Sequence, residues 1–315
     1  MHIAIILNQI FILALLVFVG IIATRYKIIT QEGRLVLAKV IINVTLPFLL
    51  VTKIAHLKPT AQLIESGLSV FVLSFFAISI LYFSGRRSSK IVGLNIEDSK
   101  IHLLHTMFGN IIFIGFPLFD ALFPGGEGLF YAAIFQLSSN SVLWTAGIMM
   151  LDKKSTKNVF SKLLNINTIA FIIGVSLFAF SVKLPSFIIM SFGKLGETTI
   201  YLSMLYIGSI LTQSRFKSLF QQKYLYSIGL NKLILSPIVI LIIIKLVDVV
   251  IPIPISQNAL TVLVMQSGMP CMAIIVMLCA EYGYNAKMAS ENLFFTTLFS
   301  VISIPFLYWF IGIVW

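Results

Sequence analysis

Long apolar stretches, separated by short polar links, dominate the pattern along the 315-residue chain. A stretch of about 20 apolar residues is long enough for a helix to cross the hydrocarbon core of a bilayer. The pattern predicts ten such spans, at residues 3–24, 35–52, 65–84, 102–123, 128–151, 163–182, 195–212, 224–246, 258–280 and 292–314. Because the links are too short to hold a soluble domain, we expect an all-α polytopic membrane protein.

The fourth predicted span contains an amide, two glycines and a proline within residues 107–120. Pro117 has no backbone N–H and crowds the carbonyl four residues earlier, so Phe113 is expected to lose its helical hydrogen bond. An unpaired carbonyl in hydrocarbon costs several kcal/mol unless protein or a water-filled cavity covers it. The interruption is therefore expected to be either a packed kink or part of a binding site.

The ninth and second predicted spans also contain interruptions. Pro270 is expected to free the carbonyl of Gln266, with Gly268 between them, and Pro47 to free that of Asn43. Matched interruptions in two halves of a chain are typical of transporter sites near the middle of the membrane. The alternative is that each proline makes a simple kink, which is common in membrane helices.

If spans four and nine unwind and cross, each second half-helix presents free N–H groups and the positive end of its dipole. Such helix ends bind anions, while unwound carbonyls can hold a cation. Asn110 lies seven residues before Pro117, on nearly the same helix face, with Gly115 between them. We therefore predict an anion site with Asn110 as a hydrogen-bond donor.

Composition agrees with the membrane class, with 59% hydrophobic and 10% charged residues. The net charge of +11 could indicate nucleic-acid binding, but the basic residues lie mostly in the links, so no nucleic-acid partner is predicted. The even-numbered links hold five of them: Lys53, Lys58, Lys183, Lys194 and Lys245. The odd-numbered links hold fifteen: Arg25, Lys27, Arg34, Arg86, Arg87, Lys90, Lys100, Lys153, Lys154, Lys157, Lys162, Arg215, Lys217, Lys223 and Lys287. This asymmetry predicts cytoplasmic odd-numbered links and both termini outside.

The rhythm of the spans suggests two repeats of five, at residues 1–151 and 163–315, joined by a short cytoplasmic link at 152–162. A shift of 158 residues lays the first five spans on the second five without a gap. A rival alignment places Pro117 on Pro270. Because each half has an odd number of spans, the second half is expected to insert upside down relative to the first.

A few ionisable groups lie within or at the edge of predicted spans, where they are rare and often functional. Asp120, Glu281 and His105 are candidates for coupling to a proton or a cation. The alternatives are side chains that reach the membrane surface and a histidine that only packs. Polar Gln136, Ser138, Ser139 and Asn140 of span five are expected either to join helices or to line the cavity.

The run Asn110-Ile-Ile-Phe-Ile-Gly115-Phe-Pro117-Leu118, with Pro270 and then Glu281-Tyr-Gly downstream, resembles the auxin efflux carrier family. That family includes the plant PIN auxin exporters and bacterial malate or malonate permeases, and the resemblance covers essentially the whole chain. Three departures are Ile274, where many bacterial members have asparagine, and Ile275 and Ala280, where plant members have proline and lysine.

The resemblance implies an inverted-repeat fold similar to sodium/proton antiporters and bile-acid transporters. Helices 4 and 9 would cross in a transport domain of helices 3–5 and 8–10. Helices 1, 2, 6 and 7 would form a scaffold that often makes a homodimer. It also implies that Asn110 contacts a substrate carboxylate.

The leading hypothesis is a secondary transporter in the plasma membrane that exports a small organic anion by an elevator-type movement. Its energy would come from the membrane potential or from coupled H⁺ or Na⁺. The candidate substrate-binding residues are Asn43, Asn110, Gly115, Pro117, Gln266, Gly268, Pro270 and Ile274. The alternative is a non-transporting receptor that binds a lipid, sterol or metabolite in the same cavity.

An enzyme is disfavoured by the motifs of the chain. Neither an HExxH pair nor a GxSxG or CxxC motif occurs, so no catalytic residue, cofactor or metal is predicted. Membrane lipids and the transported anion are the expected partners.

Overall fold

The computed structural model describes residues 2–151, 164–182, 184–212 and 221–315, and these residues are helical apart from short connections. The predicted link at 152–162 lies outside the described residues. So do seven of the basic residues used to predict the orientation: Lys153, Lys154, Lys157, Lys162, Lys183, Arg215 and Lys217.

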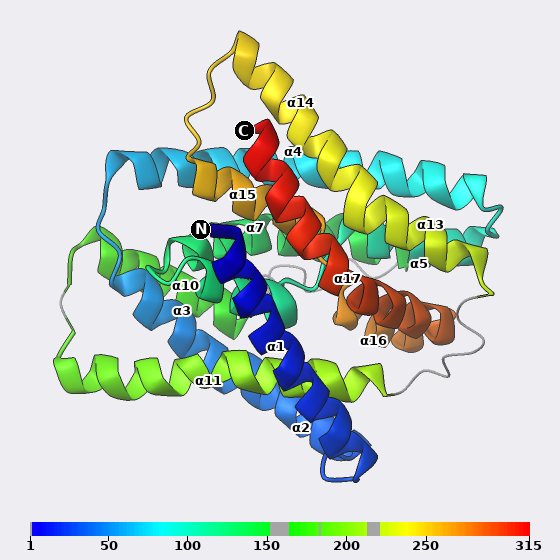
Figure 1. The fold of residues 1–315 in the computed structure, drawn as a ribbon, viewed down its shortest axis with the longest axis horizontal. Coiled ribbons are helices and arrows are strands. Elements are labelled where there is room, and N and C mark those ends of the chain that lie inside the picture. Colours follow the sequence, from blue (N-terminus) through cyan, green and yellow to red (C-terminus); the bar gives the residue numbers. More distant parts are fainter. Residues whose placement is uncertain (1, 152–163, 183, 213–220) are drawn as a thin grey trace.

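Helices occupy all the ranges predicted to be apolar spans, several of them in more than one piece (Figure 1). The first half contains α1 (His2–Arg25), α2 (Gln31–Val40), η1 (Ile41–Thr45), α3 (Leu46–Ala55), α4 (Ala61–Ile91), α5 (Ile96–Met107), η2 (Ile111–Gly115), α6 (Phe116–Leu122), α7 (Glu127–Val142), η3 (Leu143–Gly147) and α8 (Ile148–Leu151). The second half contains α10 (Ile166–Ala179), α11 (Ser186–Leu211), α13 (Lys223–Leu230), η4 (Asn231–Leu235), α14 (Ser236–Val250), α15 (Gln257–Ser267), α16 (Ala273–Glu281) and α17 (Ala286–Val314). The η segments are π-helical turns.

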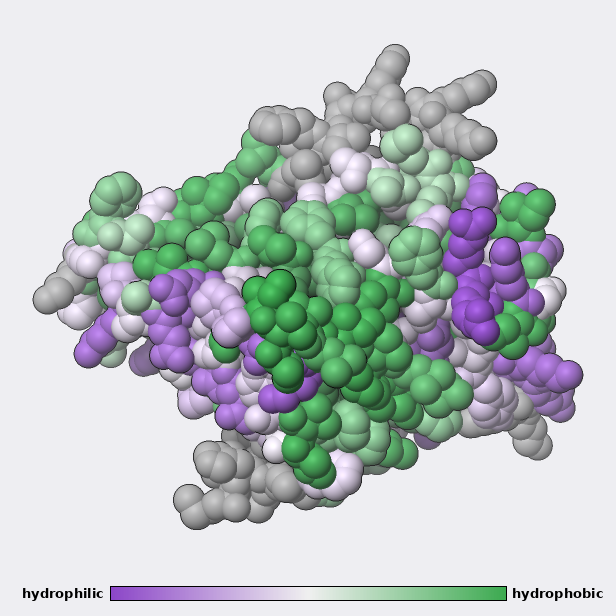
Figure 2. Space-filling view, turned by 90° about the horizontal axis from the view of Figure 1, so that it is seen from above, coloured by the Kyte–Doolittle hydropathy of each residue, from purple (hydrophilic) through white to green (hydrophobic). Residues whose placement is uncertain are grey.

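The all-helical, apolar character of the fold agrees with a polytopic membrane protein. Within the described residues, five helices are long and apolar enough to cross a membrane: Gln31–Ala55, Ala61–Ile91, Glu127–Leu151, Lys223–Val250 and Ala286–Val314. Shorter apolar helices cover Phe11–Arg25, Ile111–Leu122 and Ile166–Ala179. Figure 2 shows apolar side chains gathered in a central band, with hydrophilic side chains on both flanks.

Three of the prolines within helices follow π-helical turns and do not break the chain's helical course. Pro47, Pro117 and Pro237 each follow a π-helical turn by two residues. The residue before each proline donates its N–H to the carbonyl five residues earlier, as Phe116 does to Ile111. The wider turn absorbs the hydrogen bond that the proline cannot make. The predicted break at Pro117 is therefore wrong: the chain stays helical from Ile111 to Leu122.

The true interruption of span four is the extended segment 108–110, and it meets the interruption of span nine. Gly109 and Cys271 form an antiparallel bridge. On its two sides, the Asn110 N–H donates to the Pro270 carbonyl at 2.7 Å, and the Met272 N–H donates to the Phe108 carbonyl at 3.2 Å. The two breaks thus satisfy each other's backbone groups, as burial in an apolar protein requires. We call this pairing the crossing.

The prediction that Pro270 leaves the Gln266 carbonyl without a hydrogen bond is also wrong. It accepts the Met269 N–H at 3.2 Å, so Pro270 does not leave it free. The turn formed by residues 266–269 ends α15 before the chain enters the crossing.

The helices pack into two groups. α11 packs along α1 and α3, and α3 packs against α10, whereas α4 packs on α5 and α7, and α17 on α13 and α16. In Figure 1, α4 and α11 run along opposite edges of the molecule. α11 begins at Ser186, before the predicted start at residue 195, and Gly193 therefore lies inside the helix. A Cβ added to Gly196 would lie 2.6 Å from the Leu49 backbone nitrogen, so glycine is needed for this close approach to α3.

Candidate functional site

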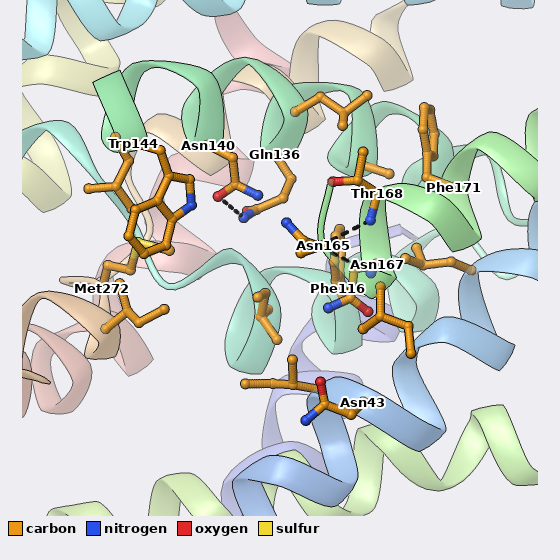
Figure 3. Close-up of a pocket in the computed structure, with 18 residues that line it drawn as sticks. Asn43, Phe116, Gln136, Asn140, Trp144, Asn165, Asn167, Thr168, Phe171 and Met272 are labelled. Atoms are coloured by element: carbon orange, nitrogen blue, oxygen red, sulfur yellow. Dashed lines mark hydrogen bonds between the residues drawn. The ribbon is translucent and has the colours of Figure 1, made fainter. Parts of the chain in front are cut away.

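A cavity of about 230 Å³ lies between the two groups of helices, beside the crossing (Figure 3). Its polar lining is dominated by the carboxamides of Asn43, Gln136, Asn140, Asn165 and Asn167, and we call it the amide pocket. Its other lining residues are Ile42, Leu50, Ile112, Phe116, Ala133, Leu137, Leu143, Trp144, Ile166, Thr168, Phe171, Met272 and Ile274. No charged side chain is among these lining residues, all of which lie in described parts of the chain.

Gln136 and Asn140, one turn apart on α7, point toward each other in the pocket (Figure 3). Gln136 Nε2 donates to Asn140 Oδ1 at 2.7 Å. Gln136 is only 7% exposed, and its Oε1 atom has no hydrogen-bond partner among the described residues. An unsatisfied buried polar atom is costly, so it indicates a place where a ligand or water would bind.

The first turn of α10 forms a second polar wall. The Asn165 Oδ1 atom accepts the backbone N–H groups of Asn167 and Thr168, both at 3.1 Å, and so caps the helix (Figure 3). Oδ1 of Asn167 has no partner among the described residues. The sequence interpretation missed Asn165, Asn167, Thr168 and Trp144. An asparagine followed by polar residues at the start of a predicted span is a cap signal that could have identified the first three.

Helix N-termini converge on the amide pocket from three elements. α10 contributes its first turn, and the helix Ile111–Leu122 contributes Ile112 and Phe116. α16 contributes Ile274, and the residue at its N-cap position, Met272, provides no side-chain cap. The positive ends of these dipoles favour negative charge. With neutral amides as its only strongly polar side chains, the pocket is suited to a small anion.

Asn110 and Gln266 occupy the crossing and do not line the pocket. Asn110 Oδ1 accepts the Phe113 N–H at 3.4 Å and caps the second half-helix, while its Nδ2 has no partner among the described residues. Gln266 is fully buried, and neither of its amide atoms has a described partner. A Cβ added to Gly115 would lie 3.0 Å from Gln266 Oε1, so the two segments are in close contact.

The predicted binding residues therefore separate into two layers. Asn43 and Ile274 line the amide pocket. Asn110 and Pro270 belong to the crossing, and Gly115 lies against the Gln266 side chain. Pro117 is buried inside α6, and Gly268 packs against Pro237 and Leu307.

The three candidate coupling residues lie apart from one another. Asp120, at the end of α6 and 5% exposed, forms an ion pair with Lys53 of α3 at 3.1 Å. Lys53 also lies 3.8 Å from Glu197 of α11. His105 is fully buried on α5, and Glu281 is exposed at the end of α16.

Paired interruptions of apolar helices, beside a pocket that contains uncharged amides, are typical of membrane transporters. Comparison with known proteins agrees: the chain matches the membrane transport protein family over residues 5–162 and 155–308. The protein thus belongs to this family, that of the auxin efflux carriers, as the resemblance predicted. It is 24% identical to an uncharacterized transporter of Methanocaldococcus jannaschii, over 96% of this chain and 98% of that protein.

Proposed function

We propose that the protein is a secondary transporter that exports a small organic anion, a carboxylate, across the plasma membrane. The observation that carries this proposal is the amide pocket, where three helix N-termini meet and no charged side chain lines the wall. A carboxylate there gains charge-assisted hydrogen bonds from amide and backbone N–H groups. It meets no fixed positive charge among the lining residues, so it can leave again.

The size and chemistry of the pocket support a small, oxygen-rich substrate. A volume of about 230 Å³ is below the range of about 300–1,000 Å³ for sites of drug-sized ligands. A carboxamide offers both an acceptor oxygen and an NH₂ donor, so Gln136 and Asn140 could bind the hydroxyl and the carboxylate of one hydroxy acid.

The membrane potential alone can drive export of an anion. Moving one charge through 100 mV releases about 2.3 kcal/mol, enough to concentrate a univalent anion outside about fifty-fold. H⁺ or Na⁺ coupling is the alternative, with Asp120, Glu281 or His105 as the coupling group. Within the described residues, only Asp120 of these three forms an ion pair between the two groups of helices, with Lys53 of α3, so a movement of one group relative to the other would change its environment.

We further propose ten membrane spans in two inverted five-helix repeats, with both termini outside. Antiparallel pairing of the two breaks is the arrangement expected when two inverted repeats meet in the middle of the membrane. α1, α3, α10 and α11 correspond to the scaffold and the remaining long helices to the transport domain. The amide pocket lies between the two groups, where an elevator-type movement would carry its contents. Dimerisation through the scaffold is an expectation from the family.

Uptake of radiolabelled acetate, lactate and malate into proteoliposomes tests the proposal. We expect saturable flux, and the Gln136→Leu variant is expected to weaken apparent affinity at least about tenfold, since hydrogen bonds to charged groups contribute about 1.5–3 kcal/mol. Asn258→Ala is the matched control, because Asn258 bonds Glu127 away from the pocket. Absence of saturable flux, or flux unaffected by Gln136→Leu, would contradict the proposed site.

A second candidate function is a non-transporting receptor for a lipid, sterol or metabolite. It is favoured by the apolar side chains that share the pocket wall, among them Trp144, Phe171 and Met272. Mass spectrometry of the purified protein distinguishes the two functions. A lipid that copurifies stoichiometrically in a protein without carboxylate flux would favour the receptor.

A further inference from the structure

Lys232 is buried behind the crossing, on the π-helical turn η4. Its side chain is 0% exposed, and its Nζ atom has no hydrogen-bond partner among the described residues. Of the ion pairs within the described residues, none includes Lys232. An isolated ammonium in an apolar interior is strongly disfavoured, so Lys232 either gives up its proton or needs a negative charge nearby.

Among the described residues, the surroundings of Lys232 supply polar atoms but no acidic partner. The titratable groups that interact with it electrostatically are Cys271, in the second break, and His105 of α5. The carboxamide of the preceding residue, Asn231, already has hydrogen-bond partners. Its Oδ1 accepts from Ser84 and Ser236, and its Nδ2 donates to Ser88. It therefore offers no acceptor to the amine.

The next polar layer, on α17, does contain unused hydrogen-bonding capacity. Asn292 is fully buried, and its Nδ2 lies 3.2 Å from His105 Nδ1, while its Oδ1 has no partner among the described residues. One turn further, Thr296 Oγ1 accepts the Cys271 N–H at 3.0 Å. We call Lys232, His105, Asn292 and Thr296 the basic cluster.

The second break contacts both the basic cluster and the amide pocket. Cys271 packs in one cluster with Ile228, one helical turn before Lys232, whereas the next residue, Met272, lines the pocket. Successive side chains of an extended segment point to opposite sides, so the second break has one face toward each site. An anion in the amide pocket is thus the negative charge available to a protonated Lys232.

We propose that Lys232 is a proton-binding site whose protonation is linked to anion binding in the amide pocket. The inference rests on the proposed function and adds to it the identity of the coupled ion. The proton comes from water, binds the free amine, and stays while the anion is bound. Because linkage is reciprocal, the anion favours protonation and the proton favours anion binding. Anion and proton then move together. A univalent anion and one proton carry no net charge, so in this case the outward anion gradient, and not the membrane potential, drives export, and protons leave with the anion.

Isothermal titration of the purified full chain with L-lactate and L-malate, in buffers of different ionisation enthalpy, tests the inference. The wild type is expected to take up about one proton per bound anion, and its affinity to fall by up to tenfold per pH unit on the alkaline side. Lys232→Met is expected to bind weakly and to take up no proton. Lys232→Arg stays protonated, so it is expected to bind without proton uptake and without this pH dependence.

Two controls make the assignment specific. Lys39→Met removes an exposed lysine of α2 and is expected to behave like the wild type. His105→Gln removes the neighbouring imidazole and is expected to retain proton uptake. If Lys232→Met does not fold, Lys232→Arg carries the test, because it keeps the charge.

The failures of the two proposals can be told apart. Binding that depends on Gln136 but takes up no proton overturns only the role of Lys232. Proton uptake that persists in Lys232→Arg, or is lost only in His105→Gln, also overturns that role. If neither anion binds the wild type at any pH, both the proposed function and this inference fail.

Discussion

Two cavities of nearly equal volume lie against the same half-helix, and they differ in what lines them. The amide pocket, about 230 Å³, touches the helix Ile111–Leu122 at Ile112 and Phe116. A second cavity, about 240 Å³, touches it at Ile114 and Leu118. We call the second the apolar groove, and its other lining residues are Leu13, Ala14, Val17, Phe18, Ile21, Met204, Ile207, Leu211, Thr297, Leu298, Ser300, Val301 and Ile304.

The difference lies in which parts of the helices face each cavity. The apolar groove is walled by the interiors of α1, α11 and α17, whose backbone groups are already paired within the helices. The wall of the amide pocket includes the beginnings of α10, of the helix Ile111–Leu122 and of α16, where the positive ends of helix dipoles lie, together with the carboxamides of α7. Cavity volume alone therefore does not distinguish the two cavities, whereas the helix beginnings and carboxamides that line them do.

The largest expected effect comes from adding a negative charge to the amide pocket. Asn140→Asp keeps the shape of the side chain but should repel an anionic substrate, and we expect carboxylate affinity to fall about 100-fold, or about 2.7 kcal/mol. Ser300→Asn places an amide in the apolar groove instead and should leave affinity unchanged. Both are measured by titration calorimetry. Equal losses in the two variants would mean that the cavities do not differ in function.

A smaller effect is expected at the crossing that supports one wall of the pocket. A Cβ on Gly109 would lie 2.8 Å from Met269 Cβ, so Gly109→Ala should cost about 1–3 kcal/mol of unfolding free energy. Gly125→Ala is the control, because nothing lies within 4 Å of its added Cβ. Thermal unfolding in detergent measures both. An unchanged melting temperature for Gly109→Ala would show that the two breaks are not tightly packed.

The ion pairs at the end of α6 should contribute less. Asp120→Asn leaves Lys53 without its buried partner and is expected to cost about 1–3 kcal/mol, toward the lower end because Lys53 is 23% exposed. Glu197→Gln should change stability by less than about 0.5 kcal/mol, because Glu197 is 55% exposed and 3.8 Å from Lys53. Chemical denaturation of both variants ranks them. The reverse order would place the important contact between α3 and α11.

The smallest effect is expected inside the apolar groove. Thr297 Oγ1 is buried without a partner among the described residues, so Thr297→Val should change unfolding free energy and carboxylate affinity by less than about 0.5 kcal/mol. Thr168→Val, in the first turn of α10, is the matched change in the amide pocket. A loss of affinity larger for Thr297→Val than for Thr168→Val would move the anion site to the groove.

The sequence pattern predicted the helical class, the ranges of the apolar helices and the two interruptions, because these depend on local composition. It misplaced the first break, because a π-helical turn lets Pro117 remain inside a helix. A π turn adds one residue, which rotates everything beyond it by about 100° relative to a straight helix. Asn110 and Pro117 therefore do not lie on one helix face, contrary to the prediction.

The site itself was only partly predictable. Asn43 and Ile274 were named, and Gln136 and Asn140 were weighed as cavity residues. Asn165 and Asn167 reach the same pocket from the second half of the chain, and no local pattern states which helices will meet. The burial of Lys232 is likewise a tertiary property: its sequence neighbourhood, at residues 231–235, resembles that of a lysine near the end of a span.

The antiparallel bridge between Gly109 and Cys271 has a consequence for how such proteins diversify. The crossing is held by main-chain hydrogen bonds, which are indifferent to most side chains. The amides that face the cavity come from η1, α7 and α10, none of which contributes to that bridge. Substitution of a few cavity residues can therefore change the substrate during evolution, while the main-chain hydrogen bonds of the crossing stay the same.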